Sequence, residues 1–258
     1  VMPNPRLRRL LVRLWTSNRD EWVSVTGIPL WINSWKESGY LNAARNTSGS
    51  VVLRQEISSL LILALLLAPG DTFVDVGANV GLYSAALARL KRFQPGMRCY
   101  AFEANPDTFR RLQRTLKNSG VVLSDAAVSD RPGRLRCSEG GISGVFRVDA
   151  GAIAGLDVAA VTLDAAEIWG NSIVLKIDVE GHEMPVLAGA AQLFADGRIK
   201  AVFLDGFSDA GIPAWLQARD FLLFGGRSLL PFKPGAPTLL AVHRDYFRSR
   251  GEPAIPAA

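Results

Sequence analysis

The feature that most constrains the fold is a regular alternation that begins near Gln55, where apolar runs of strand length alternate with helical stretches. This alternation is typical of repeated β-α-β units, in which parallel strands form one sheet and helices cover its faces. A final antiparallel hairpin is expected within residues 228–247. The pattern predicts an α/β fold with strands at 72–76, 98–103, 120–123, 172–179 and 199–207, and helices at 79–90, 105–120, 184–195 and 213–221.

The chain of 258 residues, 48% hydrophobic, is long enough to bury one substantial core. We therefore expect one main domain at residues 51–258, preceded by an N-terminal extension at residues 1–50. The extension is basic and holds four of the six tryptophans. The apolar run at residues 57–68 is shorter than the roughly 20 residues of a membrane span, so it predicts a buried helix packed on the sheet.

The charge of the chain is concentrated at its N-terminus. The formal net charge is +5, and residues 1–20 contribute +4 of it. The remainder is close to neutral and offers no basic stripe, which argues against a nucleic-acid partner. Cys99 and Cys137 belong to no metal-binding spacing and are expected to be reduced thiols. No secretory signal is visible, so the expected location is the cytoplasm.

Residues 5–15, "PRLRRLLVRLW", form a basic amphipathic pattern. Leu7, Leu10, Leu11 and Leu14 share one helical face, and arginines lie across from them. The pattern predicts a helical start to the extension, packed on its own domain. The alternative is contact with an anionic membrane surface, which would make the protein cytoplasmic but peripheral to the membrane.

A glycine loop follows the first expected strand, in "FVDVGANVGLYS". Gly77 and Gly81 would let the backbone pass close to a ligand at the opening of a helix. Their G-x-x-x-G spacing lacks the middle glycine of the dinucleotide fingerprint. Asp75, just ahead of the loop, would repel a diphosphate and attract a cation. The loop therefore predicts a ligand that is nucleoside-like but not anionic.

Two further acids complete this expected site. Glu103 ends the second strand, where a nucleotide site places the acid that accepts hydrogen bonds from the ribose hydroxyls. Asp125 follows the third strand and could accept from an adenine amino group. S-adenosylmethionine satisfies these requirements, since it carries adenine, a free ribose, a sulfonium and an amino group, with no phosphate.

Five blocks of the chain resemble, in order and spacing, those of FkbM-type methyltransferases: "FVDVGANVGLYS", "AFEANPDTFRRLQRTLKNSG", "AAVSD", "TLD" and "VLKIDVEGHEMPVLAGA". The resemblance covers about residues 51–245. It implies a class I methyltransferase, a Rossmann-like sheet of strand order 3-2-1-4-5-7-6 with strand 7 antiparallel and helices on both faces. It also implies methyl transfer from S-adenosylmethionine, usually to a hydroxyl of a sugar or natural product. Matching positions place the cofactor on Asp75, Gly77, Asn79, Gly81 and Glu103; Asp125, where the family varies, and Ala126 complete the expected set.

An acidic cluster, "KIDVEGHE", lies at the end of the fourth strand. A hydroxyl must lose its proton as it is methylated, so a positioned base is needed there. We predict Asp178, Glu180 and His182 as the catalytic candidates; His182 rests on its chemistry, because the family varies at that position. Alternatively, Asp178 holds the amino-acid end of the cofactor, or carboxylates here chelate Mg²⁺. We expect no metal.

Two rival functions are retained. A nicotinamide-dependent oxidoreductase is disfavoured by the glycine spacing and by the lack of a Tyr-x-x-x-Lys motif. A cofactor-binding protein without turnover would share the site and differ only in activity. The acceptor pocket is expected to draw on residues 20–50, 139–150 and 205–235, and the sequence leaves the acceptor and the oligomeric state open.

Overall fold

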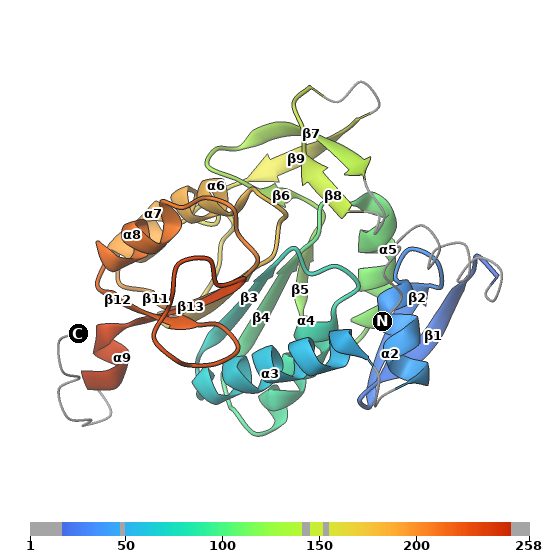
Figure 1. Cartoon of the computed structure of the whole chain (residues 1–258), viewed down its shortest axis with the longest axis horizontal. Coiled ribbons are helices and arrows are strands. Elements are labelled where there is room, and N and C mark those ends of the chain that lie inside the picture. The colour runs from blue at the N-terminus through green and yellow to red at the C-terminus, as the bar shows by residue number, and fades with distance from the viewer. Residues whose placement is uncertain (1–16, 47–49, 141–144, 152–154, 249–258) are drawn as a thin grey trace.

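The computed structural model describes residues 17–46, 50–140, 145–151 and 155–248 (Figure 1). Its centre is a seven-stranded sheet in the order β12-β13-β11-β10-β3-β4-β5. β13 runs antiparallel to both of its neighbours, and the other pairs are parallel. The strands are β3 (Thr72–Val76), β4 (Arg98–Phe102), β5 (Val122–Ser124), β10 (Ile173–Ile177), β11 (Ile199–Asp205), β12 (Phe221–Gly225) and β13 (Thr238–His243).

Counted along the chain, these seven strands lie in the order 3-2-1-4-5-7-6, and the seventh is the antiparallel one. The expected α/β fold class is therefore confirmed. The central strands β3 and β10 are buried along their whole length, as strands covered on both faces must be. Val74 and Leu175 point into one core cluster, whereas Phe73 and Val174 point into the cluster on the other face.

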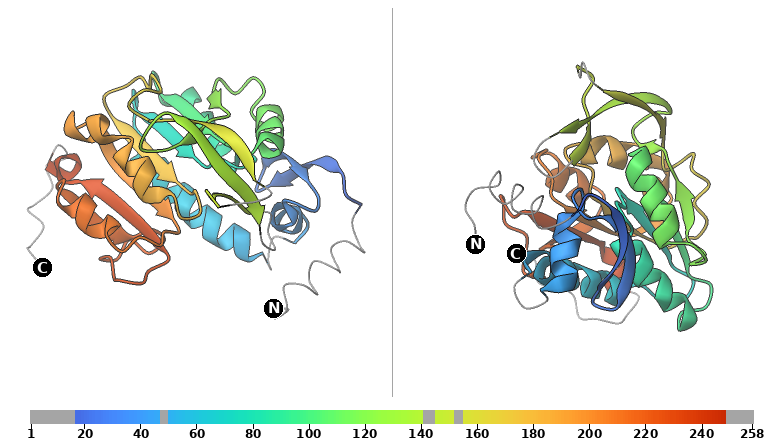
Figure 2. Two further views of the ribbon diagram at one scale, coloured as in Figure 1. Left: turned by 90° about the horizontal axis from the view of Figure 1, so that it is seen from above. Right: turned by 90° about the vertical axis from the view of Figure 1, so that its right-hand side faces the viewer.

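Helices cover both faces of the sheet (Figures 1 and 2). Buried residues of α6, α7 and α8 belong to the first core cluster, and those of α3 and α4 to the second. The helices are α3 (Val51–Leu66), α4 (Leu82–Leu87) continued by the 3₁₀ helix η1 (Ala88–Arg92), α5 (Pro106–Thr115), α6 (Glu183–Ala188), α7 (Ala191–Ala195), α8 (Ile212–Gln217) and α9 (Arg244–Arg248).

Two expected helices differ in detail. The one expected over 184–195 is split into α6 and α7 at Gly189, whose missing side chain leaves room for the Ser129 carbonyl; a Cβ there would lie 1.9 Å from that oxygen. The apolar run in α3 is buried on one side only. Leu63 is buried, whereas Leu61 and Leu65 are 60% and 74% exposed. Within the described ranges, no helix is both long enough and apolar enough to cross a bilayer.

The final hairpin is present, but its first strand was misplaced. β12 covers Phe221–Gly225, part of which was expected to end a helix, and residues 226–237 form the connection. In the first part of the expected hairpin, Pro231 forms an isolated bridge to Phe224, and no strand is present there. Proline has no N–H to donate to a sheet, which explains why the apolar residues around it do not extend into a strand.

A second, four-stranded sheet lies over one end of the central sheet, in the order β6-β9-β7-β8 (Figure 1). It accounts for the region between 126 and 165 that was expected to be partly β. Its strands are β6 (Ala127–Val128), β7 (Gly133–Gly140), β8 (Val145–Val148) and β9 (Leu156–Val161). β8 is an edge strand, hydrogen-bonded to β7 alone within this sheet.

Residues 20–33 of the extension form a hairpin of β1 (Asp20–Val25) and β2 (Ile28–Asn33), which the sequence analysis did not predict. Thr26 and Gly27 turn the chain with φ of 51° and 79°, as two-residue hairpin turns require. A short helix, α2 (Ser38–Arg45), follows. Residues 5–15, for which an amphipathic helix and membrane contact are predicted, lie outside the described residues.

The hairpin and α2 are joined to the rest of the molecule by a mixed core and a buried ion pair. Leu30 and Ile32 share a core cluster with Val80 and Leu82. Glu37 Oε1 lies 2.9 Å from Arg111 Nη2 of α5, and both side chains are 7% exposed. The other carboxylate oxygen accepts a 2.7 Å hydrogen bond from the Asn33 N–H.

Replacing Glu37 by Ala should lower the free energy of unfolding by about 3–5 kcal/mol, because Arg111 would be left buried without its counter-charge. Urea unfolding followed by circular dichroism measures the change. Arg19→Ala is the matched control, since it breaks the exposed pair with Glu21 and should cost no more than about 1 kcal/mol. Equal losses in the two variants would contradict this role for the buried pair.

Candidate functional site

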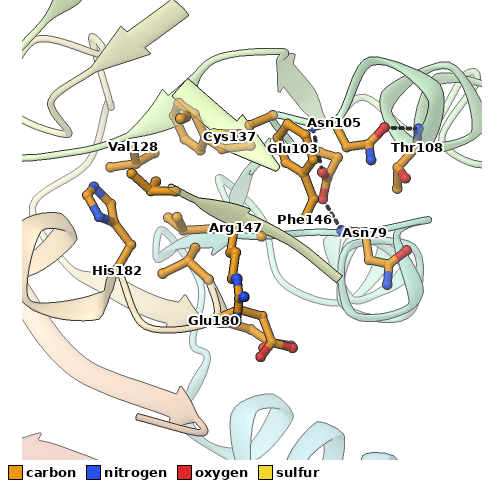
Figure 3. A pocket seen from close by; sticks show the side chains of 18 of the residues that line it. Asn79, Glu103, Asn105, Thr108, Val128, Cys137, Phe146, Arg147, Glu180 and His182 are labelled. Atoms are coloured by element: carbon orange, nitrogen blue, oxygen red, sulfur yellow. Dashed lines mark hydrogen bonds between the residues drawn. The ribbon is translucent and has the colours of Figure 1, made fainter. Parts of the chain in front are cut away.

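A cavity of about 350 Å³ opens where the carboxyl ends of β3, β4 and β10 meet (Figure 3). α2 and the loop before it form one wall, and β7 and β8 cover the opposite side. The lining residues are Lys36, Glu37, Gly39, Tyr40, Glu56, Val76, Gly77, Asn79, Phe102, Glu103, Ala104, Asn105, Thr108, Ala126, Ala127, Val128, Cys137, Phe146, Arg147, Val148, Asp178, Val179, Glu180 and His182.

The glycine loop behaves as expected at Gly77 and Asn79, which line the cavity with φ of 77° and 51°. A Cβ on Gly77 would lie 1.9 Å from the Asp178 carbonyl oxygen, so the loop touches the segment after β10 backbone to backbone. Gly81 does not line the cavity. It begins α4 in the left-handed region, and a Cβ there would lie 2.7 Å from Leu112 of α5, so its role is in packing.

Glu103 lines the cavity, and its carboxylate is held by two backbone donors. Asn79 N–H donates to Oε2 and Asn105 N–H to Oε1, each at 2.9 Å (Figure 3). Burial raises the Glu103 pKa to about 7, although both hydrogen bonds oppose the rise. Each oxygen keeps further acceptor capacity, which fits the ribose role. Asn105 also caps α5, as expected, by accepting from the N–H groups of Asp107 and Thr108.

Asp75 does not face the cavity. It is fully buried, and its Oδ2 accepts a 2.8 Å hydrogen bond from Ser84 Oγ. Its Oδ1 lies 3.2 Å from Nζ of Lys176 on the neighbouring strand β10. The expected direct attraction between Asp75 and a cationic ligand is therefore wrong for this structure, because the charge of Asp75 is already paired.

Of the last two residues in the expected cofactor set, one lines the cavity. Ala126 is buried and lines the wall, whereas Asp125 is exposed and is not among the lining residues. The predicted adenine contact of Asp125 has no support from this placement. Ala127 and Val128, which form β6, continue the wall after Ala126.

Asp178 is the acid best placed to react. Its side chain is 38% exposed and lines the cavity, and its Oδ2 lies 3.6 Å from Lys176 Nζ. Burial raises the Asp178 pKa to about 7, with further contributions from Asp205, Glu180 and Glu56, against the opposing effect of Lys176. An acid with this pKa can accept a proton near neutral pH.

Glu180 and His182 lie on the same rim. Glu180 has a φ of 53°, a left-handed conformation that is unfavourable for residues other than glycine, asparagine and aspartate. His182 Nε2 lies 2.9 Å from Ser129 Oγ, and burial lowers the His182 pKa despite the nearby Asp130. Glu183 turns inward, where its carboxylate accepts from the Gly181 N–H. The structure thus brings all three catalytic candidates to one cavity.

Sequence reasoning missed four contributors. Lys176 is a lone charge inside a fully buried strand, a signal that could have been read from "IVLKI". Burial alone would lower its pKa, but Asp75 and Asp178 raise it above the usual range. Tyr40, Glu56 and Arg147 line the cavity from α2, α3 and β8. Of the segments expected to form the acceptor pocket, 20–50 and 139–150 contribute lining residues, and 205–235 contributes none.

The part of the chain that the structure describes contains no group of three His, Cys, Asp or Glu side chains that could hold a metal ion.

Gly77→Ala should abolish cofactor binding, because its Cβ would collide with the Asp178 backbone. Calorimetric titration with S-adenosylhomocysteine measures this, and a thermal melt shows whether the variant is folded. Gly27→Ala is the matched control: its φ of 79° gives the same backbone strain, but nothing lies within 4 Å of the added Cβ. Retained affinity in Gly77→Ala would show that the close contact is not needed.

Among curated proteins, hexuronic acid methyltransferase AglP of Haloferax volcanii is 28% identical over 169 residues, which are 59% of this chain and 65% of that protein. The chain thus spans just under two thirds of the length of this relative.

Two solved structures are similar at low sequence identity. A TehB-like SAM-dependent methyltransferase from Corynebacterium glutamicum is 15% identical with a TM-score of 0.46, over 80% of this chain and 95% of that one. A SAM-dependent O-methyltransferase from Thermotoga maritima is 13% identical with a TM-score of 0.43, over 86% and 77%.

The methyltransferase FkbM domain model matches residues 75–226. This match includes the glycine loop, Glu103 and the acidic cluster. Because it spans more than half of the chain, the protein belongs to the FkbM methyltransferase family, and this membership confirms the expected cofactor, S-adenosylmethionine.

Proposed function

We propose that the protein is an S-adenosylmethionine-dependent O-methyltransferase acting on a hydroxyl group of a saccharide or natural product. One observation carries the proposal: the cavity that has the glycine loop and Glu103 at one end has Asp178, an acid with a pKa of about 7, at the other. Both halves of a methyl transfer, cofactor binding and removal of the acceptor proton, therefore have residues within one site.

The charge of the cavity wall suits this cofactor. Carboxylates outnumber cations among the lining residues even when Glu37, which is paired with Arg111, and Lys36, which is paired with Asp107, are left out of the count. The remaining charged side chains are Glu56, Glu103, Asp178 and Glu180 against Arg147. An anionic wall in a partly desolvated cavity attracts a sulfonium and an ammonium group. It repels a diphosphate, which disfavours the nicotinamide alternative. The carboxylates of the wall together attract the cationic groups of the cofactor, the role that had been predicted for Asp75.

The expected chemistry is an in-line displacement. Bound S-adenosylmethionine supplies an electrophilic methyl group on a positively charged sulfur. The sulfonium would give up its methyl group to the acceptor oxygen and leave as the neutral thioether, while the Asp178 carboxylate would accept the hydroxyl proton. Glu103 fixes the nucleoside, and the loop from Asp178 to His182 borders the space left for the acceptor. Such positioning can contribute about 7–11 kcal/mol to the barrier reduction.

The acceptor class rests on a relative. AglP is named for its action on a hexuronic acid, which supports a saccharide acceptor here.

We also propose the division of the chain into an extension at 1–50 and a methyltransferase domain at 51–258. In this proposal the extension contributes to the site, because part of the cavity wall is formed by Lys36, Glu37, Gly39 and Tyr40.

Calorimetric titration of the protein with S-adenosylmethionine and with NAD⁺ tests the cofactor. We expect binding of S-adenosylmethionine alone, weakened at least about tenfold in Glu103→Gln, which loses a charged acceptor.

The affinity for S-adenosylmethionine should also fall as the pH drops through about 7, because the raised pKa of Glu103 means that its carboxyl is protonated below that point. Binding of NAD⁺ alone would overturn the assignment. Cofactor binding with no methyl transfer to any acceptor would favour the binding protein without turnover.

At saturating cofactor, kcat/KM for the acceptor should rise with pH and level off above about 7, because Asp178 acts as a base only when ionised and kcat/KM reports the site before the acceptor binds. Asp178→Asn should remove this pH dependence and lower kcat by about 10²–10⁴, with little change in affinity for S-adenosylhomocysteine. His182→Gln is the comparison variant. A pH profile that changes in His182→Gln and not in Asp178→Asn would transfer the role of base to His182.

A further inference from the structure

Arg147 differs from the other charged residues around the cavity. It lies in the edge strand β8 and lines the cavity mouth, and in Figure 3 its side chain extends in the direction of Glu180. The side chain is exposed. Among the residues that the structure describes, it has no hydrogen-bond or ion-pair partner.

The neighbouring cations are all engaged. Lys36 Nζ lies 3.3 Å from Asp107, and Arg111 is paired with Glu37. Lys176, beneath the cavity, lies between Asp75 and Asp178. Within the described part of the chain, Arg147 is therefore the lining cation whose charge is left for a ligand. Two carboxylates could pair with this charge: that of the amino-acid end of the cofactor and that of an anionic acceptor. The position of Arg147 beside Glu180, away from Glu103, favours the acceptor, and the affinity of an Arg147 variant for S-adenosylhomocysteine distinguishes the two.

We propose that Arg147 binds a carboxylate of the methyl acceptor, so that the acceptor is an acidic saccharide of the uronic acid type. This inference rests on the proposed function, and it narrows the acceptor class. Arg147 lies on the acceptor side of the cavity, beside Glu180 and away from Glu103, which holds the nucleoside (Figure 3).

The electrostatics of the rim explain why an arginine is needed. A carboxylate that approached Asp178 and Glu180 would be repelled by both, and this repulsion grows in a partly desolvated cavity. The planar guanidinium can accept the carboxylate through two parallel hydrogen bonds, which fixes its orientation as well as its position. A single arginine matches a singly charged carboxylate better than a phosphate dianion, which is usually met by several cationic groups.

Such a site should discriminate strongly. A site built to pair with a charged group rejects the neutral analogue, because its own charge is then left unsatisfied. We expect methyl β-D-glucuronide to bind at least about tenfold more tightly than methyl β-D-glucoside or the corresponding glucuronamide, as charged hydrogen bonds commonly contribute that much. Glucose 6-phosphate should bind more weakly than the glucuronide.

The experiment is a ligand-observed NMR titration of the full chain saturated with S-adenosylhomocysteine, using these four saccharides. Arg147→Gln should lose the preference for the glucuronide and Arg147→Lys should recover part of it. Both should keep their thermal midpoint and their affinity for S-adenosylhomocysteine. Arg131→Gln, an exposed arginine of the turn before β7 that does not line the cavity, is the control for net charge.

Four results of the saccharide titrations would overturn the inference. They are no binding of the glucuronide, equal binding of acidic and neutral saccharides, tighter binding of the phosphate, and a preference that survives in Arg147→Gln. A weaker affinity of folded Arg147→Gln for S-adenosylhomocysteine would also overturn it, since Arg147 would then serve the cofactor. Arg147-dependent glucuronide binding without methyl transfer from S-adenosylmethionine would sustain the inference and refute the proposed function instead.

Discussion

The buried contact between Asp75 and Lys176 underlies the arrangement of the site. The two residues face each other on the paired central strands β3 and β10, and neither is exposed by more than 2%. An unpaired charge at either buried position would strongly destabilise the fold. Removing one partner of a buried ion pair commonly lowers the free energy of unfolding by about 3–5 kcal/mol. The pairing therefore fixes the register of the strands from which the glycine loop and the acidic loop emerge. Lys176 also extends to Asp178, so one ammonium group connects the core with the cavity wall.

Much of the fold could be predicted because its determinants are local. The apolar run of β3, the cap at Asn105 and the left-handed Gly81 each follow from a few adjacent residues. The wrong predictions concern helices and strands whose limits depend on tertiary contacts. Gly189 breaks a helix because Ser129, distant in sequence, needs its space. β12 lies in a stretch that also suits a helix, and only pairing with β13 selects the strand. The hairpin at 20–33 was obscured by the basic segment before it.

The residues of the site that could be predicted are those at or just after the ends of strands. Gly77, Asn79, Glu103 and Asp178 all follow or end buried parallel strands, and all of them line the cavity. The predicted contact of Asp75 with a cationic ligand was wrong because the sequence does not show that Lys176, on another strand, forms an ion pair with Asp75. Tyr40, Glu56 and Arg147 come from outside the strand-end positions, and two of them precede the matched family domain. The family match thus includes Gly77, Asn79, Glu103 and Asp178, while part of the cavity wall comes from residues that precede the match.

The backbone contact between Gly77 and the Asp178 carbonyl has a consequence for the order of events in a catalytic cycle. Because no side chain separates the two loops, a displacement of one is transmitted to the other without a compressible layer between them. A donor that settles on the first loop would set the position of the second before any acceptor enters. We therefore expect compulsory-order kinetics, in which the donor is the first to arrive and its demethylated form the last to leave.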